Sequence, residues 1–279
     1  MPLTTIDLKP KIGSEVQASR EALLSGDYAD ELRDLLVRRG VLVFRDLEFS
    51  PDDQRRFTGT LGDLRLGTFK AEGEGGMQKV TLDKKVNPEY AEFFPGTFFW
   101  HMDGTYDPIP PFATTLRPAQ LSQAGGNTEF ANTYAAYEDL SDEDKALVAD
   151  LKVVHSMQAA MFHAVPDASD EQITKWCSYP TPAYPLVWTH KSGRKSLVLS
   201  TSGSHIEGMH PSESFDLLKR LFDHVTQPQY VYRHEWRMND MVMWDNTGTM
   251  HRVRPYPADS GRLLHRFTLN GEEPIRAAA

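Results

Sequence analysis

Three side chains from two distant parts of the chain are of the types that bind a transition metal. His101 and Asp103 stand two positions apart, and His251 lies far downstream. Two imidazoles and one carboxylate can occupy one face of an octahedral ferrous ion and leave three coordination positions open. The set has no thiolate, which argues against a closed structural zinc site. These residue types therefore favour a reactive Fe(II), Mn(II) or Co(II) centre. The alternative is a surface histidine beside a turn aspartate, with His251 a buried histidine that binds no metal.

Two arginines follow His251 at a spacing that suits an anion-binding pocket. Arg262 comes eleven residues after His251, and Arg266 comes four residues later. Residues 262–269 alternate in the manner of a strand, so both arginines share one face and His265 lies on the opposite face, which we expect to be core. Two buried arginines need anionic partners. The pattern predicts a pocket for a planar anion such as a carboxylate; the alternative is an exposed edge strand.

Strands from both halves of the chain must position these groups. If residues 98–103 form a strand, His101 and Asp103 point to the same side and can reach one ion. Apolar runs predict further short strands, at 41–44, 196–199, 230–232, 241–244 and 263–269. Strands from both ends of the chain must then share one sheet system. A jelly roll with helices on an outer face provides that arrangement.

Periodic apolar residues and capping signals predict four helices around the strands. We expect helices over 28–39, from Ser50 to about Gly62, from Ser141 to about 151, and from Pro211 onward. The inward-facing residues expected in the last helix are Phe215, Leu218, Leu221 and Phe222. Residues 70–96 contain a glycine-rich run and look irregular, which is typical of a lid or binding loop.

Composition limits the class of protein and its partners. The 279 residues suit one domain, and the hydrophobic and charged fractions of 40% and 25% are ordinary for a globular protein. A net charge of −9 disfavours nucleic acid as a partner. No apolar run suits a membrane span of roughly 20 residues, and no secretory signal is visible. The single cysteine, Cys177, excludes an internal disulfide, favours a cytoplasmic location and is expected to be packed. The sequence leaves open whether the chain forms a homo-oligomer.

Three segments together resemble a known family, the iron(II)/2-oxoglutarate-dependent dioxygenases of the taurine dioxygenase and 2,4-dichlorophenoxyacetate dioxygenase type. They are residues 100–106, residues 125–132, and the stretch from 244 through His251 to Arg266. The resemblance extends from about residue 35 to about residue 270. The combination is much more specific than any one motif.

The resemblance implies an α+β fold, with a double-stranded β-helix (jelly roll) core and flanking helices, in one domain over residues 1–279. Active-site lids are expected near residues 65–97 and 157–185. The resemblance implies that iron is bound by His101, Asp103 and His251 and that Thr128 and Arg262 hold the distal carboxylate of 2-oxoglutarate. The substrate-binding residues that it implies are Arg266, Tyr106 and Phe162.

The implied reaction uses Fe(II), 2-oxoglutarate and dioxygen to hydroxylate a small, anionic organic substrate such as a carboxylate or sulfonate. The product can fragment if the hydroxylated carbon bears an ether, amine or sulfonate. Halogenating relatives lack the iron carboxylate, so Asp103 favours hydroxylation. Two other functions stay open: a cupin-like metal-binding isomerase or non-oxygenase binding protein, and a jelly roll without redox chemistry.

Overall fold

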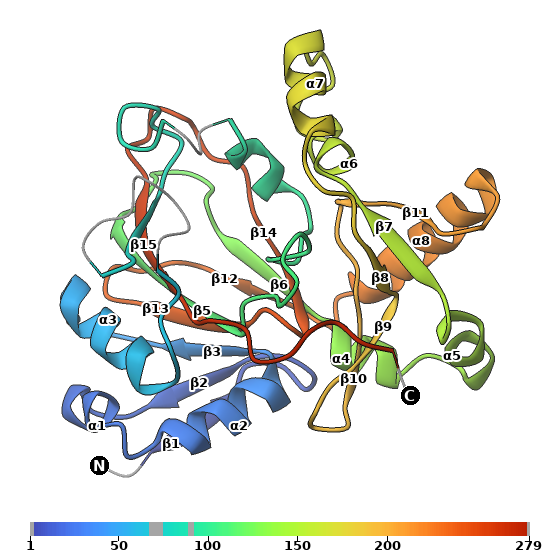
Figure 1. Ribbon diagram of the computed structural model, residues 1–279. Helices are drawn as coiled ribbons and strands as arrows, with labels where there is room; N and C mark the ends of the chain where they lie inside the picture. The colour runs from blue at the N-terminus through green and yellow to red at the C-terminus, as the bar shows by residue number, and fades with distance from the viewer. Residues whose placement is uncertain (1–2, 67–74, 89–91, 278–279) are drawn as a thin grey trace.

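The computed structural model describes residues 3–66, 75–88 and 92–277, and its largest element is a seven-stranded sheet (Figure 1). Its neighbouring strands are antiparallel except β2 and β3, which are parallel. Across the sheet the order is β1 (Thr4–Asp7), β2 (Ser14–Gln17), β3 (Val41–Phe44), β13 (Met241–Asp245), β5 (Ala113–Gln120), β15 (Leu263–Thr268) and β4 (Gln78–Val80). The sheet thus joins the two ends of the chain, as the sequence predicts.

Three helices cover the outer face of this sheet: α1 (Arg20–Ser25), α2 (Ala29–Arg39) and α3 (Pro51–Thr60) (Figure 1). Helix α2 ends where Gly40 adopts a positive φ of 72° and donates its N–H to the Leu36 carbonyl. Helix α3 begins with a capping box formed by Ser50 and Asp53. These observations confirm the first two helices predicted from the sequence.

A second sheet packs against the inner face of the first. It contains β12 (Val231–His234), β6 (Thr128–Asn132) and β14 (Thr249–Val253), with β6 in the middle. Phe130 of β6 and Trp244 of β13 lie with their ring centroids 5.5 Å apart, and both side chains are buried. Apolar contacts between the sheets therefore fix the strands that carry the candidate site.

A second group of elements lies to the right in Figure 1. Its strands are β7 (Lys152–His155), β8 (Ala183–Pro185) and β11 (Gly203–Ile206), with the pair β9 (Val187–Thr189) and β10 (Lys195–Leu197). Its helices are α4 (Thr133–Glu138), α5 (Asp142–Val148), α6 (Met157–Phe162), α7 (Asp170–Cys177) and α8 (Pro211–Val225). A short 3-10 helix, η1 (Phe94–Phe98), precedes the candidate metal ligands.

Several sequence expectations differ from the structure. Phe215 is 67% exposed, so its inward placement is wrong; α8 instead buries the stripe that contains Leu217, Leu221 and Val225. Cys177 ends α7 with an exposed thiol and is not packed. Helix α5 ends at Val148, shorter than expected. Within the described residues, no helix is long and apolar enough to cross a membrane.

Candidate active site

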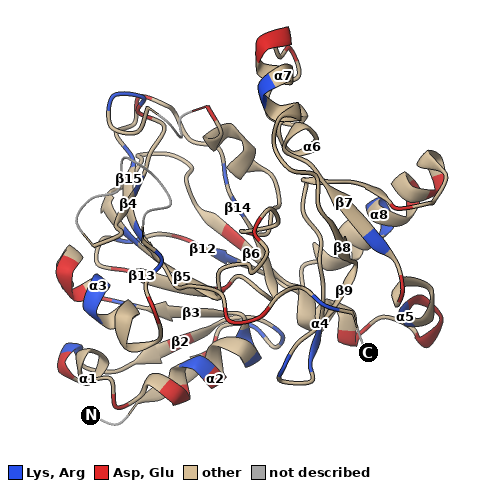
Figure 2. Cartoon of the chain, in the orientation of Figure 1, with Lys and Arg blue, Asp and Glu red and all other residues tan. Residues whose placement is uncertain are grey.

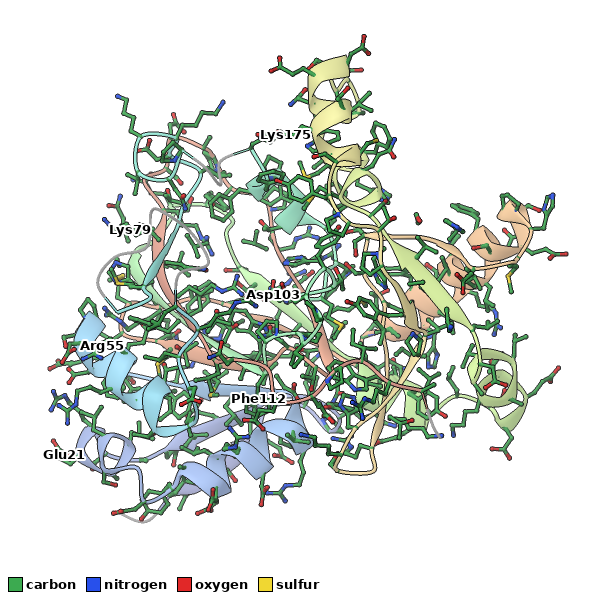
Figure 3. The ribbon with its side chains drawn as sticks, in the orientation of Figure 1. Glu21, Arg55, Lys79, Asp103, Phe112 and Lys175 are labelled. Carbon is green, nitrogen blue, oxygen red and sulfur yellow. The ribbon has the colours of Figure 1, made fainter. Side chains whose placement is uncertain are left out.

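The three predicted ligands meet at one point. One ligand atom from each of His101, Asp103 and His251 lies within 4.8 Å of the other two. The Nε2 atom of His101 is 3.9 Å from Asp103 Oδ1, and the Nε2 atom of His251 is 3.8 Å from Asp103 Oδ2. Figure 3 places Asp103 near the middle of the molecule. The spacing leaves room for one ion between the three side chains.

Backbone pairing brings the two histidines together. The His101 N–H donates to the His251 carbonyl at 3.0 Å, and the His251 N–H donates to the His101 carbonyl at 2.8 Å. Apart from this single bridge, residues 98–103 do not form the strand that the sequence predicts. Asp103 begins a turn in which Gly104 has a φ of +79°, and a Cβ on Gly104 would lie 2.3 Å from Pro111. The turn, and not strand alternation, therefore aims Asp103 at the histidines.

The protonation of these groups suits a metal. Nδ1 of His101 lies 2.9 Å from the Phe99 carbonyl, which favours the tautomer that leaves Nε2 free. Burial holds the pKa of His101 below its ordinary value, and burial together with nearby His101 holds the pKa of His251 well below it. Both imidazoles are thus neutral, as metal ligands must be. Nδ1 of His251 is buried without a hydrogen-bond partner.

Arg266 fixes the carboxylate. Its Nη2 donates to Asp103 Oδ2 at 2.5 Å, and its Nε donates to Thr268 Oγ1 at 3.2 Å. Burial alone would raise the pKa of Asp103, but the charge and the hydrogen bond of Arg266 oppose it, and the pKa lies below its ordinary value. Asp103 is therefore an anion with one oxygen already hydrogen-bonded.

A cavity of about 70 Å³, here called the inner cavity, is lined by His101 and His251 and also has Thr128 and Arg262 in its wall. Arg262 is 3% exposed, donates from Nη2 to the Gly126 carbonyl at 2.9 Å, and lies over the Tyr256 ring. Thr128 Oγ1 accepts a hydrogen bond from Trp236 Nε1 at 3.0 Å. No carboxylate among the described residues forms an ion pair with Arg262. The inner cavity thus presents a buried cation and a hydroxyl to an anionic ligand.

A larger cavity of about 370 Å³ is lined by His101 and Asp103 of the candidate metal site. Its apolar lining includes Phe93, Phe94, Tyr106, Met157, Met161 and Tyr179. The Tyr106 hydroxyl is buried without a hydrogen-bond partner. The two cavities share Phe94, Thr97, His101 and Arg266. Arg266 therefore lies where both cavities and Asp103 meet.

The structure does not bring Phe162 to either cavity. Its ring is 40% exposed and contacts Trp176 edge-on, whereas Met157 and Met161 of the same helix line the larger cavity. Sequence reasoning also missed Trp236, Tyr256 and Gly126, which surround the ends of Thr128 and Arg262. Gly126 lay inside a recognised segment, but nothing in the sequence pattern singled out Trp236.

Residues 4–268 match a family described as "Taurine catabolism dioxygenase TauD, TfdA family". The chain belongs to this family. It is 33% identical over 274 residues to the alpha-ketoglutarate-dependent 2,4-dichlorophenoxyacetate dioxygenase of Burkholderia sp. (strain RASC), covering 93% of this chain and 91% of that relative. It is 27% identical over 281 residues to the alpha-ketoglutarate-dependent sulfate ester dioxygenase of Pseudomonas putida, covering 97% of this chain and 91% of that relative.

Solved structures agree. The crystal structure of AAD-2 in complex with Mn(II) and N-oxalylglycine superimposes with a TM-score of 0.81 at 31% identity, covering 99% of this chain and 100% of that one. The chain is a dioxygenase that uses Fe(II), 2-oxoglutarate (alpha-ketoglutarate), dioxygen and a small-molecule substrate. This confirms the family resemblance seen in the sequence and disfavours the isomerase and binding-protein alternatives.

Proposed function

We propose that the dioxygenase hydroxylates a small aromatic molecule bearing a carboxylate or an oxidised sulfur group. In this proposal His101, Asp103 and His251 bind Fe(II), and Arg262 and Thr128 hold the distal carboxylate of 2-oxoglutarate in the inner cavity. The prime substrate occupies the larger cavity. The position of Arg266, which lines both cavities and bonds to Asp103, is the observation that supports this division.

The bound metal would couple oxidative decarboxylation of 2-oxoglutarate, which yields succinate and carbon dioxide, to hydroxylation of a substrate carbon. The chain's own residues bind and orient 2-oxoglutarate and the prime substrate, and they exclude water. Arg262 offers a buried guanidinium that no described carboxylate neutralises, so a dicarboxylate gains a charge-assisted hydrogen bond there. The apolar wall of the larger cavity keeps water from the reacting carbon. No protein general base is required.

Two features of the larger cavity support an aromatic, anionic substrate. Its aromatic and methionine side chains suit a flat apolar body, and methionine adapts to irregular shapes. Arg266 supplies a cation in its wall. Two relatives are named for the aromatic carboxylates 2,4-dichlorophenoxyacetate and phenoxypropionate, and a third is named for sulfate esters, which are also anionic. Hydroxylation next to an ether or ester oxygen would release the fragment beyond that oxygen.

We further propose that the two facing sheets form a double-stranded β-helix within one domain over residues 1–279. The contact of Phe130 with Trp244 between the sheets supports this arrangement. The described parts of 65–97 and 157–185 supply Phe93, Phe94 and Met161 to the larger cavity, which supports their role as lids. Residues 67–74 and 89–91 of the first segment lie outside the described residues.

Anaerobic addition of Fe(II) and then 2-oxoglutarate tests the co-substrate assignment. We expect a weak visible charge-transfer band that requires both additions. Arg262→Met should retain iron but need far more 2-oxoglutarate to produce the band. A band that forms equally well in Arg262→Met would contradict the role of Arg262. An isomerase or a binding protein would give no band.

Succinate release with aryloxyacetates, arylsulfonates and sulfate esters then tests the substrate class. We expect release that depends on one of these compounds, on iron and on oxygen. Release that is stimulated only by uncharged compounds would contradict the anionic assignment.

A further inference from the structure

Three basic side chains form a row on the outer face of the main sheet, away from both cavities. Arg117 of β5 is directly opposite His265 of β15, and His265 is directly opposite Lys79 of β4. Directly opposed side chains on neighbouring strands point to the same face. Figure 2 shows basic residues where β4 and β15 lie side by side, and Figure 3 shows Lys79 at this edge of the molecule. We call Arg117, His265 and Lys79 the basic row.

The basic row is separate from the active site. Leu116 precedes Arg117 and Arg266 follows His265, and both Leu116 and Arg266 line the inner cavity. Alternation along β5 and β15 therefore turns Arg117 and His265 the other way. Thr115 shares the face of Arg117, and its hydroxyl contacts Thr58 of α3 at 2.8 Å. The row thus lies beside α3, on the side opposite the metal ligands.

Arg117 is buried, and part of its guanidinium has no hydrogen-bond partner. It is 9% exposed, its Nε atom has no hydrogen-bond partner, and among the described residues it forms no ion pair. Nδ1 of His265 is also buried without a partner. Burial, Arg117 and Lys79 all lower the pKa of His265. An unpaired buried charge such as that of Arg117 is destabilising.

Asp53, the carboxylate whose charge affects Arg117, already accepts hydrogen bonds from other residues. Asp53 of α3 is the one acidic group that raises the pKa of Arg117, against the larger lowering effect of burial. Its Oδ1 accepts from Arg20 at 2.6 Å, and its Oδ2 accepts from the N–H and the hydroxyl of Ser50. Asp53 therefore serves the helix cap and Arg20, and leaves the guanidinium of Arg117 without a direct counterion.

We propose that the basic row is a binding site for a small oxyanion with two negative charges, of the phosphate or sulfate type. Neighbouring strands are roughly 4.8 Å apart, so the long side chains of Arg117 and Lys79 can both reach an anion centred over His265. A tetrahedral oxyanion has enough acceptor oxygens for all three donors. Arg117 provides the bidentate contact, and Lys79 provides a mobile point charge.

Inorganic phosphate, titrated at constant ionic strength against the full-length protein, tests the proposal. The readout is the His265 imidazole NMR signal, assigned by its loss in His265→Gln. We expect a saturable shift and a higher pKa for His265 when phosphate is bound. Sulfate should behave like phosphate, whereas acetate should bind at least several-fold more weakly. Acetate that binds as tightly as phosphate would overturn the assignment to a doubly charged anion.

Matched variants locate the site. Arg117→Met should weaken the phosphate response at least tenfold, and Lys79→Met, at an exposed position, should weaken it less. Arg55→Met is the control because Arg55 of α3, also labelled in Figure 3, is already paired with Asp52 at 2.7 Å. Arg262→Met excludes binding in the inner cavity. Both controls should respond like the parent protein. An unchanged response in Arg117→Met, or no saturable response in the parent, would overturn the proposal.

Thermal unfolding gives a second, independent measurement. Phosphate should raise the Tm of the parent protein, because a ligand that binds the folded state stabilises it. In phosphate-free buffer Arg117→Met should melt higher than the parent, since it removes an unpaired buried charge. Its Tm should not depend on phosphate. Equal phosphate-dependent shifts in parent and variant would also contradict the site.

Discussion

Arg266 donates a hydrogen bond of 2.5 Å to Asp103, although the two residues are 163 positions apart. The guanidinium thus contacts a candidate iron ligand and also faces both cavities. An anion bound by Arg266 would compete with Asp103 for the guanidinium, or share it with Asp103. Substrate binding and metal geometry are therefore coupled through one side chain in the proposed function.

Replacing Arg266 tests this coupling. Arg266→Gln should raise the KM for the prime substrate at least tenfold and, since it removes a partner of a metal ligand, weaken iron binding roughly 10–100-fold. The half-saturating 2-oxoglutarate concentration should change less. Arg266→Lys should recover part of the substrate affinity, because it keeps the charge. Equal losses for substrate and 2-oxoglutarate would indicate a purely structural arginine.

Replacing Arg262 should act on the co-substrate alone. Arg262→Met removes the buried cation of the inner cavity, and loss of one partner of a buried charged contact costs about 2–5 kcal/mol. We expect the half-saturating 2-oxoglutarate concentration to rise roughly 30-fold or more, with iron binding unchanged. Steady-state succinate formation and equilibrium iron titration measure the two effects. Thr128→Val, which removes a neutral hydroxyl, should give a smaller increase.

Gly126 tests how closely the backbone must approach Arg262. Its φ is +77°, and an added Cβ would lie 2.8 Å from Arg262 Nε. Gly193 has a similar φ of +82° with nothing within 4 Å, which makes Gly193→Ala a matched control. Both substitutions should lower stability by about 1–2 kcal/mol through backbone strain. Gly126→Ala alone should also weaken 2-oxoglutarate binding; the same effect in Gly193→Ala would remove the steric explanation.

Two buried histidines predict acid destabilisation. Burial lowers the pKa of His155 and of His190 to about 4. The unfolded chain therefore takes up protons below pH 6.5 that the folded chain does not, so stability is full above pH 6.5 and falls as the pH drops toward 4. Each histidine accounts for up to about 3 kcal/mol.

Urea unfolding of metal-free protein at pH 7 and pH 5 measures this loss. In His155→Gln the loss between the two pH values should be smaller than in the parent protein. His205→Gln is the control, because His205 is exposed on β11. An identical pH dependence in His155→Gln and the parent would contradict the prediction.

The sequence predicts the start of α3 and the end of α2 well, because neighbouring residues determine them. Ser50 caps α3 and Gly40 ends α2, because capping depends on residues within one turn. A strand over 98–103 is expected from the sequence because alternation would turn His101 and Asp103 to the same side. The structure forms a turn there, since Gly104 packs against Pro111 in a conformation that favours glycine.

Contacts between residues far apart in the chain could not be predicted in detail from the sequence pattern. Residue types and the family resemblance brought His101, Asp103 and His251 together correctly as a group. The bond between Arg266 and Asp103 depends on tertiary packing and was not foreseen. The inward placement of Phe215 rests on helical spacing and the role of Phe162 rests on the family resemblance, but the surface against which each helix packs decides which side chains it buries. The cytoplasmic location stays a prediction.

The paired backbone hydrogen bonds between His101 and His251 also bear on when the protein can acquire its iron. Most of the chain separates the two histidines, so this pairing is a late, entropically costly event in folding. A nascent chain that has not yet released its last strands carries only one imidazole and one carboxylate, too few to retain a ferrous ion. A chain truncated before His251 lacks the third ligand, so we expect it not to retain iron.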